Sequence, residues 1–409
     1  MEQSVNHSFR NMLLLFCALG SFASTAHGSG YGVFTQGASA LGQADAVVAH
    51  TDGPSTLFFN PALMNKLPGT QVEVGTTLLI PTRSYTAPDG STASTRDTVF
   101  TPSTFYLTHT FNDKISAGLA VFNPFGLGTD WGNDWGGVYG GRYIATKSEL
   151  TTWDINPAVS YRILPALSIA AGLDIVLLDA TLESKLGTLN GDAGQKFKGN
   201  GNGIGYNFGL ALDLPYDISL GASYRSQVTI DLDGDFTADV LPQSVGGKTT
   251  VTLPQQVCAG VAYKPTNKVT LEAGMRWEDW SSFQQLRIQF APNGYGLTSA
   301  LYPRQWSSTY AFNLGGNYRI NDSFSIMAGY LHGWNPVPDS TFEPAIPDSD
   351  TNLYTLGGEA RFSGVTVALA YGYQAQSDRY KGTNLYDAAG SGTYKSYLHL
   401  VGVSLGYKF

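Results

Sequence analysis

Residues 401–409 have the sequence VGVSLGYKF. From Val401 to Phe409 every second residue is apolar or aromatic, and the residues between them are small or polar. Because side chains alternate between the two faces of a β-strand, this stretch predicts a strand with one apolar face. A final strand of this kind, ending on an aromatic residue, is typical of bacterial outer-membrane barrels, whose outer face contacts lipid.

The composition favours one repetitive architecture over the roughly two or three soluble domains that a length of 409 residues suggests. Charged residues make up only 14 %, against about 25 % in a typical soluble domain. After the N-terminus no run of about 18 apolar residues occurs, which argues against membrane-spanning helices. The net charge of −8 gives no electrostatic reason to expect nucleic-acid binding. These features together predict an all-β transmembrane barrel.

The beginning of the chain has the features of a secretory signal peptide. Arg10 is positive, residues 12–22 form an apolar stretch, and small residues follow. We expect residues 1–28 to be this signal, with cleavage after Ala26 or Gly28.

The two cysteines support neither a lipid anchor nor a disulfide. Cys17 lies in the apolar stretch directly after Phe16, whereas a lipoprotein site needs a small residue before its cysteine. Once the signal is removed, Cys258 is the only cysteine, so no disulfide within the chain is expected.

Fourteen segments alternate well enough to predict strands. The clearest are residues 205–213, 269–277 and 365–376. A β-sandwich also produces alternation, but these segments are longer than its usual strands of about 5–6 residues. The alternation therefore predicts strands with one face toward lipid and the other toward a lumen.

Short and long connections alternate along the chain. The short ones lie at residues 112–113, 164–165, 215–216, 265–267, 321–322 and 363–364. The long ones lie near residues 81–97, 124–142, 184–203, 237–248, 282–303, 336–351 and 377–393. Tight periplasmic turns and long outer loops produce this pattern. We therefore predict a 14-stranded antiparallel barrel over residues 69–409, with both ends in the periplasm.

Residues 29–68 do not alternate, and they are too apolar to remain in solution. A barrel of this size has a lumen too wide for its wall side chains to fill. We expect the segment to fold inside the lumen as a plug, or hatch, with a turn at Asn60, Pro61 and Ala62. Without a plug the barrel is an open pore, so a general porin is the alternative.

An enzyme is the other alternative class. The histidines are few, and His109 and His399 alternate with apolar strand residues, which predicts a place at the membrane interface. Asp231 to Asp235 have the sequence DLDGD, but Gly234 and Pro242 occupy positions that exclude an EF-hand loop. We expect no catalytic site, no metal and no cofactor.

Four motifs occur in order along the chain: Asn60-Pro61-Ala62; Tyr224-Arg225-Ser226 with Ile230-Asp231; residues 280–286, WSSFQQL; and Pro336-Val337-Pro338 with Ile346-Pro347-Asp348. With these motifs the whole mature chain resembles the long-chain fatty acid transporters of the Gram-negative outer membrane. This family also includes aromatic-hydrocarbon uptake proteins. The resemblance implies that a hydrophobic ligand lands in an outer groove and moves to an internal pocket. The N-terminal hatch then shifts, and the ligand leaves sideways through a gap in the wall, without coupled energy.

Asn123, Pro124, Phe125 and Gly126 follow the predicted third strand, residues 115–122. Proline lacks an N–H and glycine allows a bend, so the wall ladder is interrupted here. From the residues alone this is either the start of an outer loop or a break in the wall. The resemblance implies the second, an inward kink that opens a lateral gap.

The resemblance also suggests ligand contacts. Tyr31 corresponds to the N-terminal residues that contact the pocket ligand. A ligand carboxylate needs a cation, because an unpaired charge in an apolar pocket is costly. Lys185 lies near a basic position of the family, and Arg276 alternates onto the lumen face of its strand. For each, a solvated or plug-paired charge is the alternative.

Trp131 and Trp135 lie in a loop that suits an amphipathic outer landing site, although aromatic girdles also use tryptophan. As partners we expect a long-chain fatty acid or similar hydrophobic molecule, outer-membrane lipid and lipopolysaccharide. We also expect the barrel-assembly machinery to recognise the Phe409 strand of a monomer. Pocket shape, which the sequence does not show, decides between acyl chains and aromatic hydrocarbons.

Overall fold

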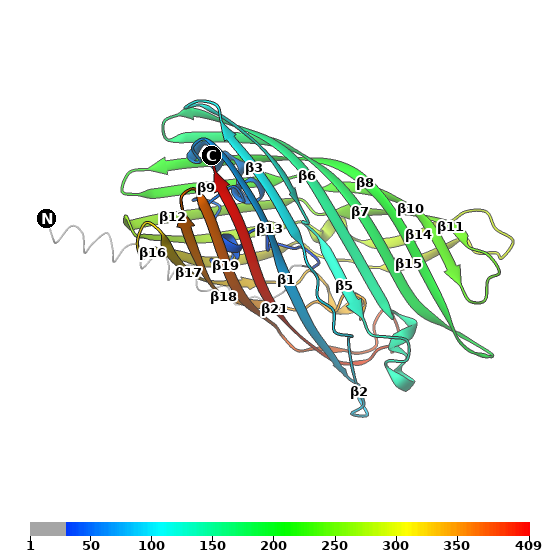
Figure 1. Cartoon of the computed structure of the whole chain (residues 1–409). Helices are drawn as coiled ribbons and strands as arrows, with labels where there is room; N and C mark the ends of the chain where they lie inside the picture. The colour runs from blue at the N-terminus through cyan, green and yellow to red at the C-terminus, as the bar shows by residue number, and fades with distance from the viewer. Residues whose placement is uncertain (1–29) are drawn as a thin grey trace.

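The computed structural model describes residues 30–409. The predicted signal, residues 1–28, lies outside the described part of the chain. The described strands form one sheet that closes into a 14-strand antiparallel barrel, as the sequence predicts (Figure 1). No helix in residues 30–409 is long and apolar enough to cross a membrane.

The barrel closes between its first and last strands. β1 (Thr70–Thr86) pairs antiparallel with β21 (Gly392–Lys408) along its whole length. The backbone N–H of Phe409 extends this contact and donates to the carbonyl of Thr70 (3.0 Å). The alternating residues 401–409 therefore supply the seam of the wall.

Several wall strands are interrupted by short breaks, so that two consecutive strands continue one another. In chain order the remaining wall strands are β3 (Ser103–Thr110), β4 (Ile115–Phe122) with β5 (Gly126–Asp130), β6 (Lys147–Leu164), β7 (Leu167–Thr188), β8 (Gly191–Leu214), β9 (Ile218–Arg225) with β10 (Val228–Ala238), β11 (Val245–Leu253) with β12 (Gln256–Thr266), β13 (Val269–Glu278) with β14 (Gln285–Phe290), β15 (Ser299–Pro303) with β16 (Thr309–Arg319), β17 (Phe324–Gly333), β18 (Thr351–Phe362), and β19 (Val365–Gln376). Short strands β2 (Thr92–Ser94) and β20 (Arg379–Lys381) pair with β1 and β21 at the loop end.

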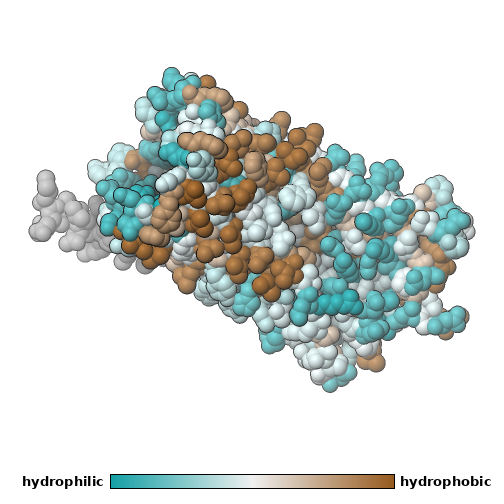
Figure 2. Space-filling view, in the orientation of Figure 1, coloured by the Kyte–Doolittle hydropathy of each residue, from teal (hydrophilic) through white to brown (hydrophobic). Residues whose placement is uncertain are grey.

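The two faces of the wall differ in the way that lipid requires. On β7, Leu173, Ile175 and Leu177 are exposed on the outer face, whereas Val176 and Leu178 are buried inside. Figure 2 shows hydrophobic residues gathered on the half of the barrel near the C-terminus, and hydrophilic residues on the half that carries the long loops. The first half is the membrane-spanning band, and the second extends beyond it.

The prediction of a long loop at residues 184–203 is wrong. β7 and β8 continue through this region as a hairpin and are joined by a turn at Leu189 and Asn190, followed by Gly191 with φ of 112°. Beyond the membrane water covers the outer face, so the apolar alternation that marks a spanning strand is lost. Asn190 and Gly191 are turn-forming residues, but the polar, glycine-rich composition around them concealed the hairpin.

Residues 30–68 pack against inward-facing wall residues near the end of the barrel that holds the C-terminus, where Figure 1 shows the short helices in blue. They form α2 (Ala38–Leu41), α3 (Thr56–Phe59) and the 3₁₀ helix η1 (Pro61–Lys66). Leu41, Leu57 and Leu63 on these helices are fully buried.

Asn60 joins two parts of the segment to the wall. Its Nδ2 donates to the carbonyls of Val48 (2.8 Å) and of Leu210 in β8 (2.9 Å). Its Oδ1 accepts from the N–H of Ala62 (3.2 Å), and Pro61 starts η1, where no N–H is needed. The Asn-Pro-Ala turn is therefore buried, and its amide satisfies backbone groups.

One wall carboxylate holds the middle of the segment. The buried Glu272 of β13 accepts from the N–H groups of Val48 (2.5 Å), Ala49 (3.0 Å) and His50 (3.1 Å). Its Oε2 also lies 2.6 Å from Nδ1 of His50. Charge-assisted bonds of this kind are stronger than neutral ones, so Glu272 is a main anchor of the segment.

Wall glycines let the segment approach closely. A Cβ at Gly221 of β9 would lie 2.0 Å from the carbonyl oxygen of Val48. A Cβ at Gly315 of β16 would lie 2.3 Å from the carbonyl oxygen of Gln43. A side chain at either position therefore forces the segment away from the wall.

We predict that Gly221→Val displaces the segment while the barrel still forms, because valine suits a strand. Limited chymotrypsin digestion in detergent should then cleave residues 30–68 faster than in the wild type. Gly246→Val is the matched control, because a Cβ there meets no atom closer than 3.6 Å. Equal protection of the segment in both variants would contradict the packing described here.

Candidate functional site: an internal cavity beside a gap in the wall

The third wall strand is kinked after Phe122. Asn123, Pro124 and Phe125 lie opposite Thr152 and Trp153 of β6, between the β4 and β5 ladders. The extra residue makes this a bulge, which bends the strand. The structure thus shows an interruption followed by a resumed strand, β5, and not the start of an outer loop.

Side chains replace the backbone pairs that are lost at the kink. Asn123 Oδ1 accepts from the N–H of Ser103 (2.9 Å), and its Nδ2 donates to the carbonyl of Thr152. The Thr152 hydroxyl accepts from the N–H of Phe125 (2.9 Å). These side-chain hydrogen bonds stabilise the kink and leave few of its backbone groups unpaired.

Beyond the kink a gap separates β5 from β1. The described pairings of β5 are with β6 alone, and no ladder joins β5 to β1. Leu79 of β1 exchanges both backbone hydrogen bonds with Phe100, so this edge of β1 is the one that borders the gap, and the backbone of Phe100 covers part of it. Alternation places the nitrogen of Pro81 on the same edge, where the missing N–H leaves no unpaired donor.

Two side chains bridge this gap. The ring of Phe100 lies against Gly128 of β5, and a Cβ at Gly128 would lie 1.9 Å from it. Arg83 of β1 donates from Nη1 to the carbonyl of Gly128 (2.7 Å). Nearer the loop end the backbone crosses as well, because the N–H of Thr95 donates to the carbonyl of Arg83 (3.0 Å) and the N–H of Arg96 donates to that of Asp130 in β5 (2.7 Å). Between this crossing and the kink the wall is closed by side chains, which move more easily than a backbone ladder.

The start of the described chain pairs with the kink from inside. The N–H of Val33 donates to the carbonyl of Pro124 (2.8 Å), and the N–H of Gly126 donates to the carbonyl of Tyr31 (2.9 Å). The side-chain amide of Gln36 donates to the carbonyl of Asn123 (2.7 Å). The N-terminal segment and the edge of the gap are thus one hydrogen-bonded unit.

A cavity of about 420 Å³ lies between this unit and the wall. Its volume is within the range of about 300–1,000 Å³ that is usual for small-molecule sites. Apolar residues of the lumen, including Leu331, Leu353 and Leu400, line its inner part. Gly126, Gly128 and the exposed Trp153 line its other side, so the cavity reaches from the lumen to the gap.

Tyr31 lies in an aromatic cage beside the cavity. Its ring centroid is 4.6 Å from that of Trp280, 5.8 Å from Trp306, and about 6 Å from Phe283 and Phe125. Contacts between rings at such distances add to the burial of their surfaces. This cage fixes the position of the N-terminal segment at the cavity.

Asp348 holds the residue before Tyr31. Its Oδ2 accepts from the N–H of Gly30 (2.8 Å), and its Oδ1 accepts from the amide of Gln376 (3.0 Å). Burial raises the pKa of Asp348 to about 7. This carboxyl therefore stands near its titration point at neutral pH, so the bond to Gly30 is not held by a permanent full charge.

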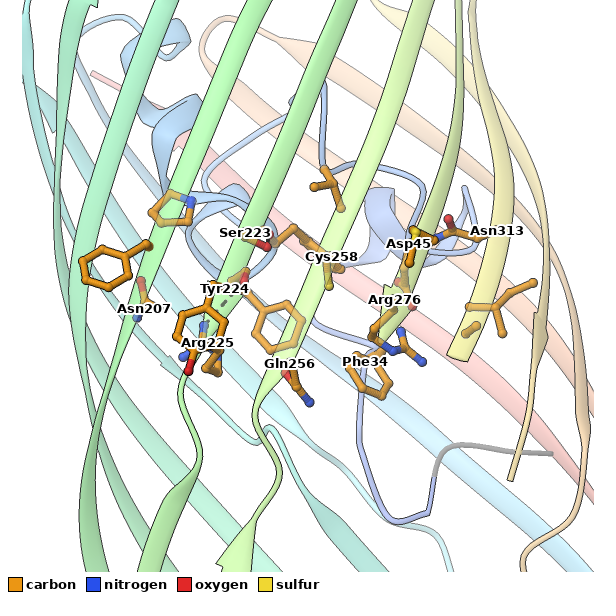
Figure 3. A pocket seen from close by; sticks show the side chains of 18 residues that line it. Phe34, Asp45, Asn207, Ser223, Tyr224, Arg225, Gln256, Cys258, Arg276 and Asn313 are labelled. Atoms are coloured by element: carbon orange, nitrogen blue, oxygen red, sulfur yellow. Dashed lines mark hydrogen bonds between the residues drawn. The ribbon is translucent and has the colours of Figure 1, made fainter. Parts of the chain in front are cut away.

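Two arginines, Arg225 and Arg276, line a second, smaller cavity of about 40 Å³ (Figure 3). The guanidinium of Arg276 lies 3.2 Å from the ring centroid of Phe34, and its Nε lies 3.3 Å from Oε2 of Glu278. Arg225 pairs with Asp174 and with Asp154 (3.2 Å). Both arginines thus have partners within the protein.

The cavity unites several of the predicted site residues. Tyr31, Arg276, Asn123, Phe125 and Gly126 all line it, although they come from three separate parts of the chain. Pro124 contributes its carbonyl, as described above, and the turn of Asn60, Pro61 and Ala62 lies nearby, with Pro61 lining the smaller cavity.

Lys185 lies elsewhere and does not line the cavity. Lys185 lies an even number of residues from the exposed Ile175 and Leu177 on β7, so its side chain is on the same, outer face of the strand. This part of β7 lies beyond the membrane. A slip of one residue in assigning such a strand exchanges its two faces. The structure therefore gives no support for Lys185 as a pocket residue.

Trp131 and Trp135 are both buried, and their rings stack at 4.6 Å. Nε1 of Trp131 donates to the carbonyl of Pro344 (3.0 Å), and Nε1 of Trp135 donates to that of Ala145 (2.7 Å). The two indoles thus join the outer loops to one another. In this arrangement they present no exposed landing surface.

The places of Arg83, Phe100 and Asp348 at the cavity were not predicted from the sequence. Pro81 within an alternating stretch was a usable sign of an unpaired strand edge at Arg83. Asp348 belongs to a motif that was noted without a role. Phe100 carried no signal, because its place depends on a contact with Gly128 of a distant strand.

One match to a hydrolase motif was also missed. Residues 402–406, GVSLG, have the Gly-x-Ser-x-Gly spacing of a nucleophile elbow. Ser404 lies within β21, not on a strand-to-helix turn, and its hydroxyl accepts from the N–H of Ala38 (3.0 Å). Ser404 is thus part of the packing of the N-terminal segment. Within residues 30–409 no group of three or more His, Cys, Asp or Glu is arranged to hold a metal ion.

Residues 19–409 match the family model described as outer membrane protein transport protein (OMPP1/FadL/TodX). The chain belongs to this family. It is therefore an outer-membrane transport protein and not an enzyme.

Relatives in the family are distant but match over most of their length. The chain is 23 % identical over 411 residues to the long-chain fatty acid transport protein of Escherichia coli K12, covering 87 % of this chain and 90 % of that one. It is 22 % identical over 419 residues to outer membrane protein P1 of Haemophilus influenzae, covering 89 % of both.

Solved structures of the family share the fold. A FadL homologue of Pseudomonas aeruginosa superposes with a TM-score of 0.84 at 20 % identity, covering 93 % of this chain and all of that one. The toluene transporter TodX of Pseudomonas putida gives a TM-score of 0.74 at 16 % identity, covering 91 % and 98 %. Similarity at this level supports the barrel and leaves the ligand open.

Proposed function

We propose that this protein is a passive outer-membrane channel for long-chain fatty acids or related hydrophobic compounds. The observation that carries the proposal is the cavity that joins the lumen to a gap in the wall. Its lining is largely apolar, as a hydrophobic ligand requires. Relatives described as long-chain fatty acid transport proteins support an acyl chain as the ligand.

In this proposal residues 30–68 are the hatch. The hydrogen bonds of Asn60 and Glu272, together with the close approach at Gly221, support a closed state in which the segment occupies the lumen. A ligand enters from an outer groove formed by the loops and reaches the cavity beside Tyr31. Displacement of residues 31–33 from the kink then frees the edge of the gap.

Lateral exit is favoured by the cost of exposing an acyl chain to water. Each exposed CH₂ costs about 0.8 kcal/mol, so release of a long chain into the periplasm costs more than about 10 kcal/mol. Passage between β1 and β5 into the bilayer avoids this cost. Phe100 and Arg83 are the side chains that such a ligand displaces, because they fill the gap in the closed state.

Aromatic hydrocarbons are the second candidate ligands. The structural similarity to a toluene transporter and the cage around Tyr31 support them. A general porin is the weaker alternative, because an open water-filled path is incompatible with a segment bound in the lumen.

The further partners are proposals as well. The outer face in the membrane band contacts lipid, and its polar extension lies at the level of lipopolysaccharide. The exposed Phe409 at the end of the seam is a recognition element for the barrel-assembly machinery. We infer a monomer, exported after cleavage behind Ala26 or Gly28.

The hatch mechanism predicts that a covalent link between the N-terminal segment and the kink blocks transport. Gly32 and Phe125 are directly opposed, and the flanking hydrogen bonds make them a non-hydrogen-bonded pair. The Cα atoms of such a pair lie about 4.5 Å apart, within the range of disulfides. Gly32→Cys with Phe125→Cys, in a Cys258→Ser background, should abolish oleate uptake when oxidised and restore it on reduction.

Each single cysteine variant controls for the loss of the original side chain, including the displacement of the Phe34 ring that a Cβ at Gly32 requires. The cross-link is verified by mass spectrometry. Full uptake through a completely oxidised double variant would show that the hatch need not leave the kink.

The function itself is tested in a strain that lacks this protein. We predict slow growth on limiting oleate, and recovery on complementation, because the proposed channel supplies the acyl chain with a passive route across the outer membrane. Growth on an aromatic hydrocarbon, measured separately, assigns the ligand class. Unimpaired uptake of both compounds would refute the transport proposal.

A further inference from the structure

We infer that Arg83 is the residue that selects ligands with a carboxylate head group, which makes a fatty acid the preferred ligand class over a neutral hydrocarbon. The inference rests on the proposed transport function and refines it. It concerns a residue that neither the motifs of the sequence nor the comparisons point to.

The position of Arg83 follows from the strand edge that borders the gap. On β1, Leu79, Pro81 and Arg83 share the inward face, and all three line the cavity. The guanidinium reaches across the gap to the carbonyl of Gly128 (2.7 Å). Arg83 therefore stands where the cavity meets the gap, on the route that the ligand takes.

Arg83 is a cation without a carboxylate partner. Asp348, across the same cavity, attracts it electrostatically, but no carboxylate in the described part of the chain lies within salt-bridge distance, and the acceptor that it does have, a backbone carbonyl, is neutral. A guanidinium offers five N–H donors, so the bond to Gly128 leaves others for a ligand. A desolvated cation without an anion is costly, and an entering carboxylate offsets that cost.

The other charged groups that line the cavity are Arg276, Asp348 and Asp45. Arg276 is the second cation among the described lining residues, and it has Glu278 and the Phe34 ring as partners. Asp348 binds Gly30 and Gln376. Asp45 also lines the cavity but forms no salt bridge with Arg83. Of the two cations, Arg83 is therefore the one that has no ion pair within residues 30–409, and it is the one left to bind a ligand carboxylate.

This placement has a consequence for the direction of exit. A head group held by Arg83 stays at the gap, while the apolar tail extends along the cavity that Leu79 and Leu400 line. A carboxylate bound by the remaining donors can draw the guanidinium into the cavity, which breaks its bond to Gly128 and removes a side-chain bridge across the gap. Binding of the carboxylate and opening of the gap are therefore linked through the same guanidinium.

The test uses two ligands that share a chain and differ in the head group, brominated stearate and the corresponding brominated alcohol. Bromine quenches nearby indoles, and Trp280 and Trp306 both contact Tyr31, which lines the cavity. The full-length mature protein is titrated in a neutral detergent as wild type, Arg83→Gln and Arg83→Lys. Arg287→Gln, an exposed arginine on β14, is the matched control.

We expect Arg83→Gln to weaken binding of the acid by about tenfold or more, as the loss of a charged hydrogen bond predicts. Binding of the alcohol should remain unchanged, and Arg83→Lys should retain part of the preference for the acid. Unchanged binding of the acid by Arg83→Gln, or equal weakening of both ligands, would overturn the inference. A wild type that binds the alcohol but not the acid would overturn it while leaving a hydrophobic channel. A wild type that binds neither would instead refute the proposed function.

Discussion

Hydrocarbon offers no hydrogen-bond partner to an unpaired backbone group, and the wall of this protein is organised by that constraint. β1 pairs with β21 along its whole length, so the sheet has no free edge there. Between β1 and β5 the ladder of backbone hydrogen bonds is interrupted, which leaves the gap. Pro81 removes a donor from its edge, Asn123 supplies side-chain partners, and Tyr31 and Val33 supply backbone partners from inside.

The N-terminal segment therefore has two structural roles that depend on the same residues. It packs against wall glycines such as Gly221, and it completes the hydrogen bonds of the kinked strand. Movement of the segment leaves the edge of the gap unpaired, and opening of the gap loosens the segment. In the proposed mechanism this coupling explains how a passive channel stays closed until a ligand arrives.

Much of this architecture is predictable from the sequence. The alternation at residues 401–409 marks the seam, and Asn123 to Gly126 mark the kink, because both depend on local chemistry. The hairpin of β7 and β8 was missed, since water on its outer face removes the alternation. Lys185 was named from the resemblance alone, and its position along β7 places it on the outer face, away from the cavity. Arg83 and Phe100 depend on contacts between distant strands, which local patterns do not encode.

The most direct test of the account is a crystal structure of the mature protein grown with oleate. We expect an acyl chain in the cavity between Tyr31 and Leu400, in a lumen that residues 30–68 occupy in the ligand-free crystal. A lumen left open by these residues without ligand, or oleate bound only on the outer surface of the barrel, would contradict it.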